Sequence, residues 1–415
     1  MRILIVTQRF WPENFRINDL ATELVSRGHE VTVLTGLPSY PEGRVFDDFK
    51  AAPEKYSQYQ GVDIVRVPII SHSTQKIKLI FNYVSFVLSA SVIGAYKLLG
   101  QGFDVIFTYE PSPVTVGIPA AVFRKLKSAP MAFWVLDLWP ETLSAVGVVR
   151  NTWILKMVGL MVRAIYRNCD LILAQSKSFI GQIRTYTRAD KRVEYFPSWS
   201  ETGFEENHVE PAAEIVTDPE TFNILFAGNI GAAQDFPSIL AAVKLLQHHT
   251  HIRWHIVGDG RMAPQVHSWI AEHGLQNNIV MYGRFPLDKM PSFFKHADAL
   301  LVSLKNDPIF AMTIPGKLQT YLSAGIPVLG MLDGEGADLI NRSRAGLTCP
   351  AGDATGLAKI VLEMSKMPEA QRKAMGKQGK EIMSREFDRT HLIDQLEQWL
   401  LDLKQMRNAC DRNLN

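Results

Sequence analysis

Two regions of the sequence repeat the same order of elements, and this repeat constrains the fold more than any other feature. In the first region, Ile3–Thr7 is predicted to form a buried strand, residues 18–27 a helix and Glu30–Thr35 a second strand. This order within the first 35 residues is typical of a right-handed parallel crossover. The same order starts again at Phe222 and reaches a strand at Ile252–Val257. The sequence therefore predicts an α/β protein with two similar domains.

Length and segment composition agree with two domains. The chain has 415 residues, more than one hydrophobic core usually supports. A polar, acidic segment from Pro197 to Pro219 has no hydrophobic period and is predicted to be the interdomain linker. We therefore expect a first domain at residues 1–200, and a second domain, including the linker, at residues 201–389. A helix predicted from Arg372 to about Lys404 is expected to return to the first domain, which then gains residues 390–415.

Several protein classes are disfavoured by what the sequence lacks. No GxGxxG follows the first strand, which weakens the case for a nicotinamide or flavin site. No GKS or GKT follows the glycine turn at residues 258–260, which disfavours a P-loop. The three cysteines are far apart, without metal or disulfide spacing, so a reducing compartment is expected. The first apolar run is too short for a signal peptide and is soon followed by Pro12, so a cytoplasmic location is predicted.

Charge is divided unevenly between the two halves of the chain. The net formal charge is +2, but residues 1–200 carry 23 Lys and Arg against 16 Asp and Glu. A basic first half favours an anionic partner there, such as a phosphorylated acceptor or a lipid surface. Nucleic acid is not expected as a partner, because no basic run is interleaved with aromatic residues.

Glycines occur at the predicted ends of several strands in the second domain. Gly228 and Gly231 in GNIGAAQ bracket a tight turn, where backbone N–H groups can meet phosphate. A second glycine turn follows at residues 258–260, and Gly283 follows a third apolar run. Because the carboxyl ends of parallel strands share one edge of a sheet, these turns are expected to lie together.

Three cations accompany these glycine turns. Pro315 suits a helix entry, so Lys317 in PGKLQTYLSAGIPVLG is predicted to lie beside free backbone N–H groups. Arg261 and Arg284 directly follow two of the glycine turns. We interpret the set as a pocket for a phosphorylated nucleotide, although each cation taken alone is equally typical of a solvated surface.

The strand-end loops of the first domain are also expected to converge. Two of them carry carboxylates, Glu110 in YEPSP and both Asp137 and Glu141 in DLWPE. A carboxylate at such a loop can accept a proton from an acceptor hydroxyl, and the alternative for Asp137 is helix capping. We predict that Glu110 and Glu141 bind the acceptor together with Asn14 and Arg16, which lie in the loop after the first strand.

Two apolar helices are predicted in the first domain. Leu79–Tyr96 has no charge in 18 residues and is flanked by lysines. A membrane crossing here would separate strands of one sheet, so a helix in the membrane interface or a buried helical pair is more consistent. Trp153–Arg167 is a basic amphipathic helix. A membrane surface is therefore predicted as a partner, with core packing as the open alternative for both helices.

The motifs together resemble the GT-B glycosyltransferases, in particular family 4, over nearly the whole chain. They are RGHEVTVLTG at residues 27–36, DLWPE at 137–141, GNIG at 228–231, VGDG at 257–260 and KLQTYLSAGIPVL at 317–329. Within the family, FAMTIPGKLQTYLSAG is most similar to bacterial surface-polysaccharide enzymes. Among these it looks closest to the N-acetyl-L-fucosamine (L-fucosamine) transferases of O-antigen assembly, with colanic-acid transferases nearby.

The resemblance implies two Rossmann-like domains with parallel sheets facing across a cleft, and a C-terminal helix that crosses back to the first domain. It implies that the second domain holds a nucleotide sugar, that the first holds the acceptor, and that neither a metal nor a further cofactor is required. The donor contacts implied by motif are Gly228 and Asn229 at the diphosphate, Gly258 and Gly260 at the nucleotide, Arg284 and Phe285 at the base, and Lys317 and Leu318 at the diphosphate and ribose.

The sequence departs from the family at positions that usually carry charge. The usual glutamate pair maps to Met312 and Thr320, the usual arginine and lysine after the second domain's first strand map to Asn229 and Gln234, and the usual histidine before DLWP maps to Leu136. We hypothesise that Lys317, with Arg284 or Arg261, neutralises the phosphates and that Thr320 binds the ribose. Asn229 and Gln234 remain as uncharged donor contacts. The catalytic candidates are Lys317 and, on the acceptor side, Asp137.

The predicted activity is transfer of a 6-deoxy-amino sugar, N-acetyl-L-fucosamine from its UDP form, to a lipid-diphosphate-linked N-acetylglucosamine. The acceptor is a polyprenyl-diphosphate-linked sugar, and the enzyme is predicted to act at the cytoplasmic face of the inner membrane in O-antigen or related polysaccharide synthesis. Two alternatives remain. One is a UDP-sugar epimerase on the same fold, and the other is a non-catalytic protein that binds a nucleotide sugar in an assembly complex.

Overall fold

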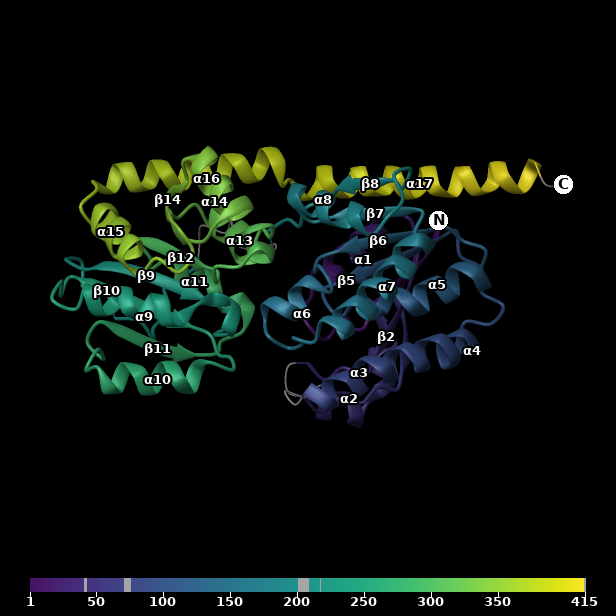
Figure 1. Cartoon of the computed structure of the whole chain (residues 1–415), viewed down its shortest axis with the longest axis horizontal. Coiled ribbons are helices and arrows are strands. Elements are labelled where there is room, and N and C mark those ends of the chain that lie inside the picture. Colours follow the sequence, from purple (N-terminus) through teal and green to yellow (C-terminus); the bar gives the residue numbers. More distant parts are fainter. Residues whose placement is uncertain (41–42, 71–75, 201–208, 217, 414–415) are drawn as a thin grey trace. The chain divides into compact units, whose positions relative to one another are not determined.

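The computed structural model describes residues 1–40, 43–70, 76–200, 209–216 and 218–413. Contacts divide the chain into two units, one of Met1–Pro197 with Thr390–Asn415 and one of Ser198–Arg389. Figure 1 shows a separate sheet in each unit. Part of the expected linker, residues 201–208 and 217, lies outside the described residues.

The first unit is built on an eight-stranded sheet in the order β3-β4-β2-β1-β5-β6-β7-β8. All neighbouring strands are parallel except β3 and β4. The strands are β1 (Arg2–Val6), β2 (Glu30–Gly36), β3 (Gln58–Tyr59), β4 (Val62–Val67), β5 (Val105–Glu110), β6 (Met131–Val135), β7 (Leu171–Ala174) and β8 (Val193–Tyr195). The central strands β5, β6 and β7 are buried at every residue, as expected for a parallel sheet covered on both faces.

Helices connect these strands, and Figure 1 shows them around the sheet. They are α1 (Arg16–Ser26), α2 (Asp47–Ala51), α3 (Lys76–Ser89), α4 (Ala95–Lys97), α5 (Gly117–Leu126), α6 (Glu141–Ala145), α7 (Thr152–Asn168) and α8 (Lys177–Thr185). A π-helical turn, Ala90–Gly94, joins α3 to α4, so the predicted apolar helix at residues 79–96 is helical throughout.

The last helix, α17 (Arg389–Asn413), packs on the first unit as the predicted fold requires. The guanidinium of Arg27 pairs with Asp394 at 2.5 Å and with Glu397 at 2.8 Å, and Trp399 packs edge-on against Phe196. The single helix predicted from Arg372 to Lys404 is wrong in one respect. It is two helices, because Phe387 leaves the helical conformation and buries its ring in the core of the second unit.

The second unit has a six-stranded, fully parallel sheet in the order β11-β10-β9-β12-β13-β14. Its strands are β9 (Phe222–Ala227), β10 (Ile252–Val257), β11 (Ile279–Gly283), β12 (Ala299–Ser303), β13 (Val328–Met331) and β14 (Gly346–Cys349). Its helices are α9 (Phe236–Leu245), α10 (Ala263–Glu272), α11 (Met290–Phe294), α12 (Pro308–Ala311), α13 (Gly316–Ala324), α14 (Gly334–Ser343), α15 (Ala354–Ser365) and α16 (Glu369–Glu386).

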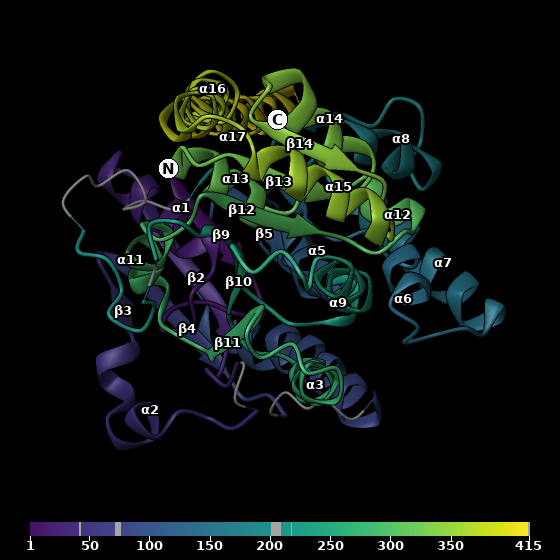
Figure 2. The same ribbon diagram turned by 90° about the vertical axis from the view of Figure 1, so that its left-hand side faces the viewer.

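Helices cover both faces of this sheet (Figure 2). Alternate residues of β9 belong to two different cores: Phe226 lies in the core with α9, α10 and α15, and Leu225 lies in the core with α11, α13, α14 and α16. This alternation follows from the two-residue period of a strand. The two parallel α/β units confirm the predicted fold class.

Both sheets contain a point at which the strand order reverses. In the first sheet β1 lies between β2 and β5, and in the second β9 lies between β10 and β12. Ligands of open α/β sheets bind at the carboxyl ends of the strands beside such a point. The loops that follow β1 and β5 in the first unit, and β9 and β10 in the second, are therefore where each site is expected.

Candidate active site

The central residue of the second unit's site is Lys317, in the first turn of α13. Its Nζ lies 3.6 Å from the centroid of the Phe226 ring, is shielded from solvent and has no hydrogen-bond partner. No carboxylate pairs with it within the described residues, and burial lowers the pKa of Lys317 to about 7. In this turn the N–H of Leu318 donates to the Pro315 carbonyl at 2.8 Å, and the N–H groups that precede it have no acceptor within the helix. The site therefore has unused capacity for an anion.

Two glycine turns lie under this lysine. A Cβ atom at Gly228 would lie 3.3 Å from Lys317 Nζ, so the lysine rests on the turn that follows β9. A Cβ atom at Gly258 would lie 1.8 Å from the Gly228 carbonyl oxygen, closer than any real contact. Gly258 also has a φ of +144°, in the region that favours glycine. The two strand ends thus pack backbone against backbone, and only glycine permits this.

Backbone hydrogen bonds fix the rest of this turn. The Ile230 N–H donates to the Asp259 carbonyl at 2.9 Å, and the Met262 N–H donates to the Ile230 carbonyl at 2.9 Å. A Cβ atom at Gly260 would lie 2.5 Å from that same Ile230 carbonyl oxygen. The loops after β9 and β10 therefore form one rigid cradle beside Lys317.

The uncharged residues predicted to face the donor have different places in this cradle. Asn229 is exposed beside Gly228, whereas the Gln234 side chain accepts the N–H of Gly231 at 3.1 Å and so shapes the turn. Thr320 is half-buried on α13, with its hydroxyl 3.5 Å from the Gly316 carbonyl. The Leu318 side chain is fully buried in the core, and its backbone N–H donates to the Pro315 carbonyl at 2.8 Å.

The two predicted arginines lie on solvent-facing loops. Arg261 follows Gly260 and Arg284 follows Gly283, and both side chains are exposed. Phe285 is half-buried and packs against Phe293 with ring centroids 4.7 Å apart. Lys317 thus has the buried charged group of the predicted set, and the two arginines are exposed cations.

Sequence reasoning missed two aromatic residues that place the lysine. Phe226, beneath the ammonium, gives no signal in the sequence because an aromatic residue inside a strand is usually core. Tyr321 holds α13 against the end of β9, since its hydroxyl contacts both the N–H and the carbonyl of Ala227 at 2.9 and 3.1 Å. Both residues are fully buried, and together they set where Lys317 lies.

The first unit collects carboxylates at the ends of β5 and β6. Asp137 follows β6 and is half-buried. Its Oδ1 accepts a hydrogen bond from the Thr142 hydroxyl at 2.5 Å, and its Oδ2 accepts one from the Trp139 indole N–H at 3.1 Å. Burial raises the pKa of Asp137. The capping alternative is not supported, because α6 begins at Glu141 with Pro140 as its N-cap residue.

Glu110, at the end of β5, is fully buried beside Asp137. Its Oε2 accepts the backbone N–H of Asp137 at 3.2 Å, and its Oε1 has no hydrogen-bond partner. Burial, and secondly the charge of Asp137, raise the pKa of Glu110 well above its usual range. The structure thus brings together two of the predicted carboxylates.

The other predicted acceptor residues are more dispersed. Glu141 Oε1 accepts hydrogen bonds from Gln182 at 2.6 Å and Tyr186 at 2.5 Å, while its Oε2 is buried without a partner. This carboxylate therefore ties α6 to α8. Asn14 is exposed and Arg16 is half-buried at the start of α1.

Two residues near Asp137, Tyr83 and Ser112, were not singled out from the sequence as site residues, and neither was Arg9, whose charge acts on Tyr83. Tyr83 of α3 packs edge-on against Trp139, and burial raises the pKa of Tyr83 to about 12. The Arg9 guanidinium lies 3.9 Å from the ring centroid of Tyr40. Ser112 has a φ of +114°, a conformation that non-glycine residues rarely adopt and that is common at functional sites. The spacing of residues in the sequence does not predict any of these contacts.

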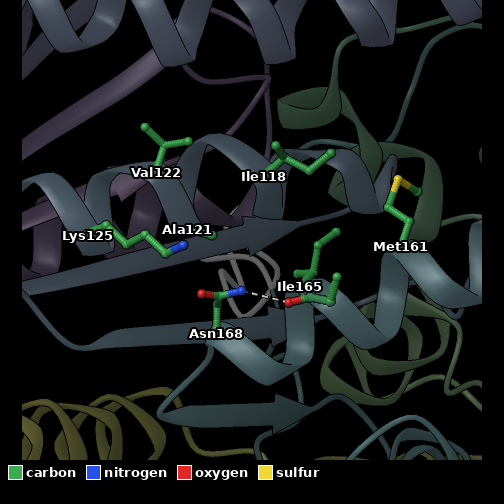
Figure 3. A pocket seen from close by; sticks show the side chains of 8 residues that line it. Ile118, Ala121, Val122, Lys125, Met161, Ile165 and Asn168 are labelled. Carbon is green, nitrogen blue, oxygen red and sulfur yellow. Dashed lines mark hydrogen bonds between the residues drawn. The ribbon is translucent and has the colours of Figure 1, made fainter.

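An apolar groove of about 300 Å³ lies between α5 and α7 in the same unit (Figure 3). Its lining is mainly aliphatic, with Lys125 and Asn168 as its polar side chains. The Asn168 amide is occupied, because it donates to the Ala164 carbonyl at 2.8 Å. The described lining of the groove carries no carboxylate, and none of its residues is among those predicted for the site. Over the described part of the chain, no cluster of three His, Cys, Asp or Glu residues is placed to hold a metal.

Comparison with known proteins assigns both units. The family described as "Glycosyl transferase 4-like domain" matches residues 14–199, and the family described as "Glycosyl transferases group 1" matches residues 221–366. The Escherichia coli (strain K12) protein WcaI, named as a colanic acid biosynthesis glycosyl transferase, is 24% identical over 350 residues, which are 78% of this chain and 82% of WcaI.

Solved structures share the fold. Sucrose-phosphate synthase from Thermosynechococcus elongatus has a TM-score of 0.74 at 15% identity and covers 97% of this chain and 98% of its own. Anabaena HepE in complex with UDP-glucose has a TM-score of 0.68 at 16% identity and covers 97% of this chain and all of its own. The family matches span most of the chain and the fold agrees with them. The chain therefore belongs to the GT-B glycosyltransferases of family 4, and it is a glycosyltransferase.

Proposed function

We propose that this enzyme transfers a 6-deoxy-amino sugar, N-acetyl-L-fucosamine from its UDP form, to a lipid-diphosphate-linked N-acetylglucosamine during surface polysaccharide synthesis. The observation that carries the donor half of the proposal is Lys317, a buried cation without an anion beside two glycine turns. Two comparisons support it: HepE was solved with UDP-glucose, and WcaI is named for colanic acid biosynthesis. The sugar identity comes from the motif resemblance.

Lys317 is proposed to hold the donor diphosphate. Departure of a nucleoside diphosphate develops negative charge on its terminal phosphate, and a preorganised cation in a water-excluded site stabilises that charge. Arg261 and Arg284 are exposed on adjacent loops, and we place them as secondary phosphate or base contacts with Phe285. Phosphate neutralisation would then come from side-chain cations and helix N–H groups without a metal.

On the acceptor side, Asp137 is proposed as the base. Its carboxylate takes the proton of the acceptor hydroxyl, whose oxygen bonds to the anomeric carbon of the sugar. The bond from that carbon to the diphosphate oxygen breaks, and the electron pair leaves with the nucleoside diphosphate. Thr142 and Trp139 each donate a hydrogen bond to Asp137, so they hold its carboxylate in one orientation.

Membrane docking through α3 is proposed because the helix turns an apolar stripe to solvent. Along α3, the π-helical turn and α4, the exposed residues recur at three- and four-residue spacing: Phe81, Val84, Leu88, Val92 and Tyr96. The opposite stripe, Asn82, Phe86 and Ala90, is buried. By length and composition, the segment Lys78–Lys97 could also span a membrane. Because its inner stripe packs on the sheet domain, we propose that it lies in the interface plane.

Helix α7 extends the same apolar character. Trp153, Met157 and Leu160 are 72%, 51% and 58% exposed, beside the cations Lys156 and Arg163. Lysines and arginines next to exposed apolar residues favour anionic lipid headgroups. We place the enzyme on the cytoplasmic face of the membrane, where a polyprenyl-diphosphate-linked acceptor would be presented.

A donor panel tests the proposal. Purified protein is incubated with UDP-, GDP- and dTDP-sugars, including UDP-N-acetyl-L-fucosamine, and with a synthetic lipid-diphosphate-linked N-acetylglucosamine. We expect transfer from a UDP-sugar, and the highest rate with UDP-N-acetyl-L-fucosamine. Interconversion of free UDP-sugars without acceptor would indicate an epimerase instead. Donor binding without turnover would indicate the non-catalytic alternative, which the missing glutamates at Met312 and Thr320 favour.

A further inference from the structure

Glu110 differs from the other carboxylates of the first unit in how its two oxygens are used. It is 0% exposed, and Oε2 accepts two long backbone hydrogen bonds, from Leu136 at 3.4 Å and from Asp137 at 3.2 Å. Oε1 has no partner. In the part of the chain that the structure describes, Glu110 has no ion pair. An ionised carboxylate here would carry an uncompensated buried charge, which costs several kcal/mol.

Asp137 has the opposite character. Each of its oxygens has a side-chain donor, the Thr142 hydroxyl on one side and the Trp139 indole N–H on the other. The Ser112 side chain also donates to it. Donors that hydrogen-bond a carboxylate favour its ionised form. Burial raises the pKa of both carboxylates, but only Asp137 has side-chain donors that oppose this rise. The single charge of the pair is therefore better stabilised on Asp137 than on Glu110.

Within the described ranges, neither carboxylate has an ion pair that would reverse this order. Tyr83 faces the pair from α3, and Tyr166, which is fully buried, faces it from α7. Burial raises the pKa values of both phenols, and the negative charge of Asp137 raises them further. The positive charge of Arg9 acts on Tyr83, and the carboxylate of Glu141 acts on Tyr166. Two carboxylates in one low-dielectric site cannot both ionise easily.

We propose that Glu110 is a neutral carboxylic acid that positions Asp137. It holds the Asp137 backbone N–H and leaves the single negative charge of the pair on Asp137. Glu110 therefore does not bind the acceptor as a carboxylate, which is the role the sequence suggested. This proposal rests on the proposed role of Asp137 as base.

The first test compares Glu110→Gln with Glu110→Ala. The amide keeps the shape and neutrality of the protonated acid, so we expect Glu110→Gln to retain kcat within about threefold, with the acidic limb of the pH–rate profile unmoved. Glu110→Ala removes the acceptor for the Asp137 N–H, and we expect kcat to fall about tenfold or more, with the donor KM unchanged. A loss of about 100-fold or more in folded Glu110→Gln would overturn the proposal, because it would require a charged Glu110.

The second test needs no activity. If Glu110 stays protonated in the fold, the folded state holds a proton that the unfolded state releases above its ordinary pKa. Wild-type stability then falls as pH rises through this window, and Glu110→Gln removes the loss. We expect the melting temperature of Glu110→Gln, relative to wild type, to be higher at pH 7.5 than at pH 5 by about 4 °C. An equal difference at both pH values would overturn the neutral state.

Asp137→Asn separates this inference from the proposed function. If Asp137→Asn retains full activity, Asp137 is not the base and the positioning role falls with it. The melting series still decides whether Glu110 is neutral, because that measurement does not depend on transfer.

Discussion

The two units differ in the sign of the charge that they bury. The second unit buries an amine and the first a pair of carboxylates, and neither has a counter-ion in the described part of the chain. In the second unit Lys317 lies on the Phe226 ring with no partner for its Nζ. In the first unit Glu110 and Asp137 lie side by side, and no ion pair neutralises either within the described residues. Other charges of the first unit are paired, as Arg124 is with Asp170 at 2.8 Å.

This difference distinguishes charges that are paired within the fold from charges that are available to a ligand or a proton. A buried charge without a partner destabilises a protein, so it is retained where a ligand or a proton completes the site. The lysine is completed by an anion, which fits a sugar-nucleotide diphosphate. The carboxylate pair can take up a proton, and the acceptor hydroxyl must release a proton during transfer.

The largest effect is expected from Asp137→Asn. The amide keeps the size of the side chain and cannot take a proton, so kcat should fall about 10²- to 10⁴-fold with the donor Kd unchanged. The exposed Asp63 provides the control, because Asp63→Asn should leave the rate at the wild-type value. Initial rates with the lipid-linked acceptor measure both. Full activity of Asp137→Asn would mean that Asp137 does not accept the proton of the acceptor hydroxyl.

The next largest effect is expected from Lys317→Met. Turnover should fall about 10²- to 10³-fold, because the group facing the leaving diphosphate is lost. The ligand-free protein should melt about 4 °C higher or more, since an apolar side chain replaces a buried, unpaired amine. Lys295, which is exposed in the same unit, is the matched control, and Lys295→Met should change neither quantity.

That stability gain should itself depend on pH. Burial lowers the pKa of folded Lys317 to about 7, below its unfolded value, so the folded state holds fewer protons above pH 7. Wild-type stability should therefore rise with pH from about 7 towards the unfolded pKa of about 10.4. The advantage of Lys317→Met should be greatest at or below pH 7 and shrink towards pH 10. A constant difference would mean that Lys317 is ordinarily solvated.

Donor affinity should depend on the same titration of Lys317, but it should fall as the pH rises, whereas the stability of the wild-type protein rises. Only the protonated lysine attracts phosphate, so the affinity for a UDP-sugar should fall by up to about tenfold per pH unit above pH 7. Calorimetric titrations from pH 6.5 to 9 measure this slope. The slope should vanish in Lys317→Met, and a flat wild-type profile would contradict the proposed proton linkage.

The smallest of these effects concerns the membrane. Leu88→Glu places a charge in the exposed stripe of α3, and it should weaken binding to anionic vesicles by about tenfold without changing the melting temperature. Leu245→Glu is the control, because Leu245 has a similar exposed fraction, 56% against 61%, and lies in α9 outside the stripe. Vesicle co-sedimentation separates the two. Equal binding by both variants would mean that α3 does not contact lipid.

The fold followed from the sequence because apolar period and turn residues are local signals. The strand-helix-strand order at both unit starts, the glycine turns and the helix entry at Pro315 all occur where the sequence predicted them. The break at Phe387 did not follow, because its cause is burial of one ring in a core that is formed by distant residues.

The site was predictable only in part. Lys317 at a helix start was visible in the sequence, but its burial against Phe226 required the position of β9 relative to α13. In the same way, Glu110 and Asp137 are 27 residues apart, and only the parallel pairing of β5 with β6 brings them together. The protonation state of a carboxylate depends on its neighbours in space. The unequal roles of Glu110 and Asp137 could therefore not be derived from their spacing in the sequence.

Binding of UDP to wild-type protein and to Lys317→Met at pH 6.5, measured by isothermal titration calorimetry, tests the central claim most directly. Uridine, which lacks the phosphates, serves as the reference ligand. If Lys317 grips the diphosphate, the Kd for UDP should rise by about 30-fold or more in the variant, with uridine affinity unchanged. Equal affinity of the two proteins for UDP would contradict the claim and move the diphosphate site away from Lys317.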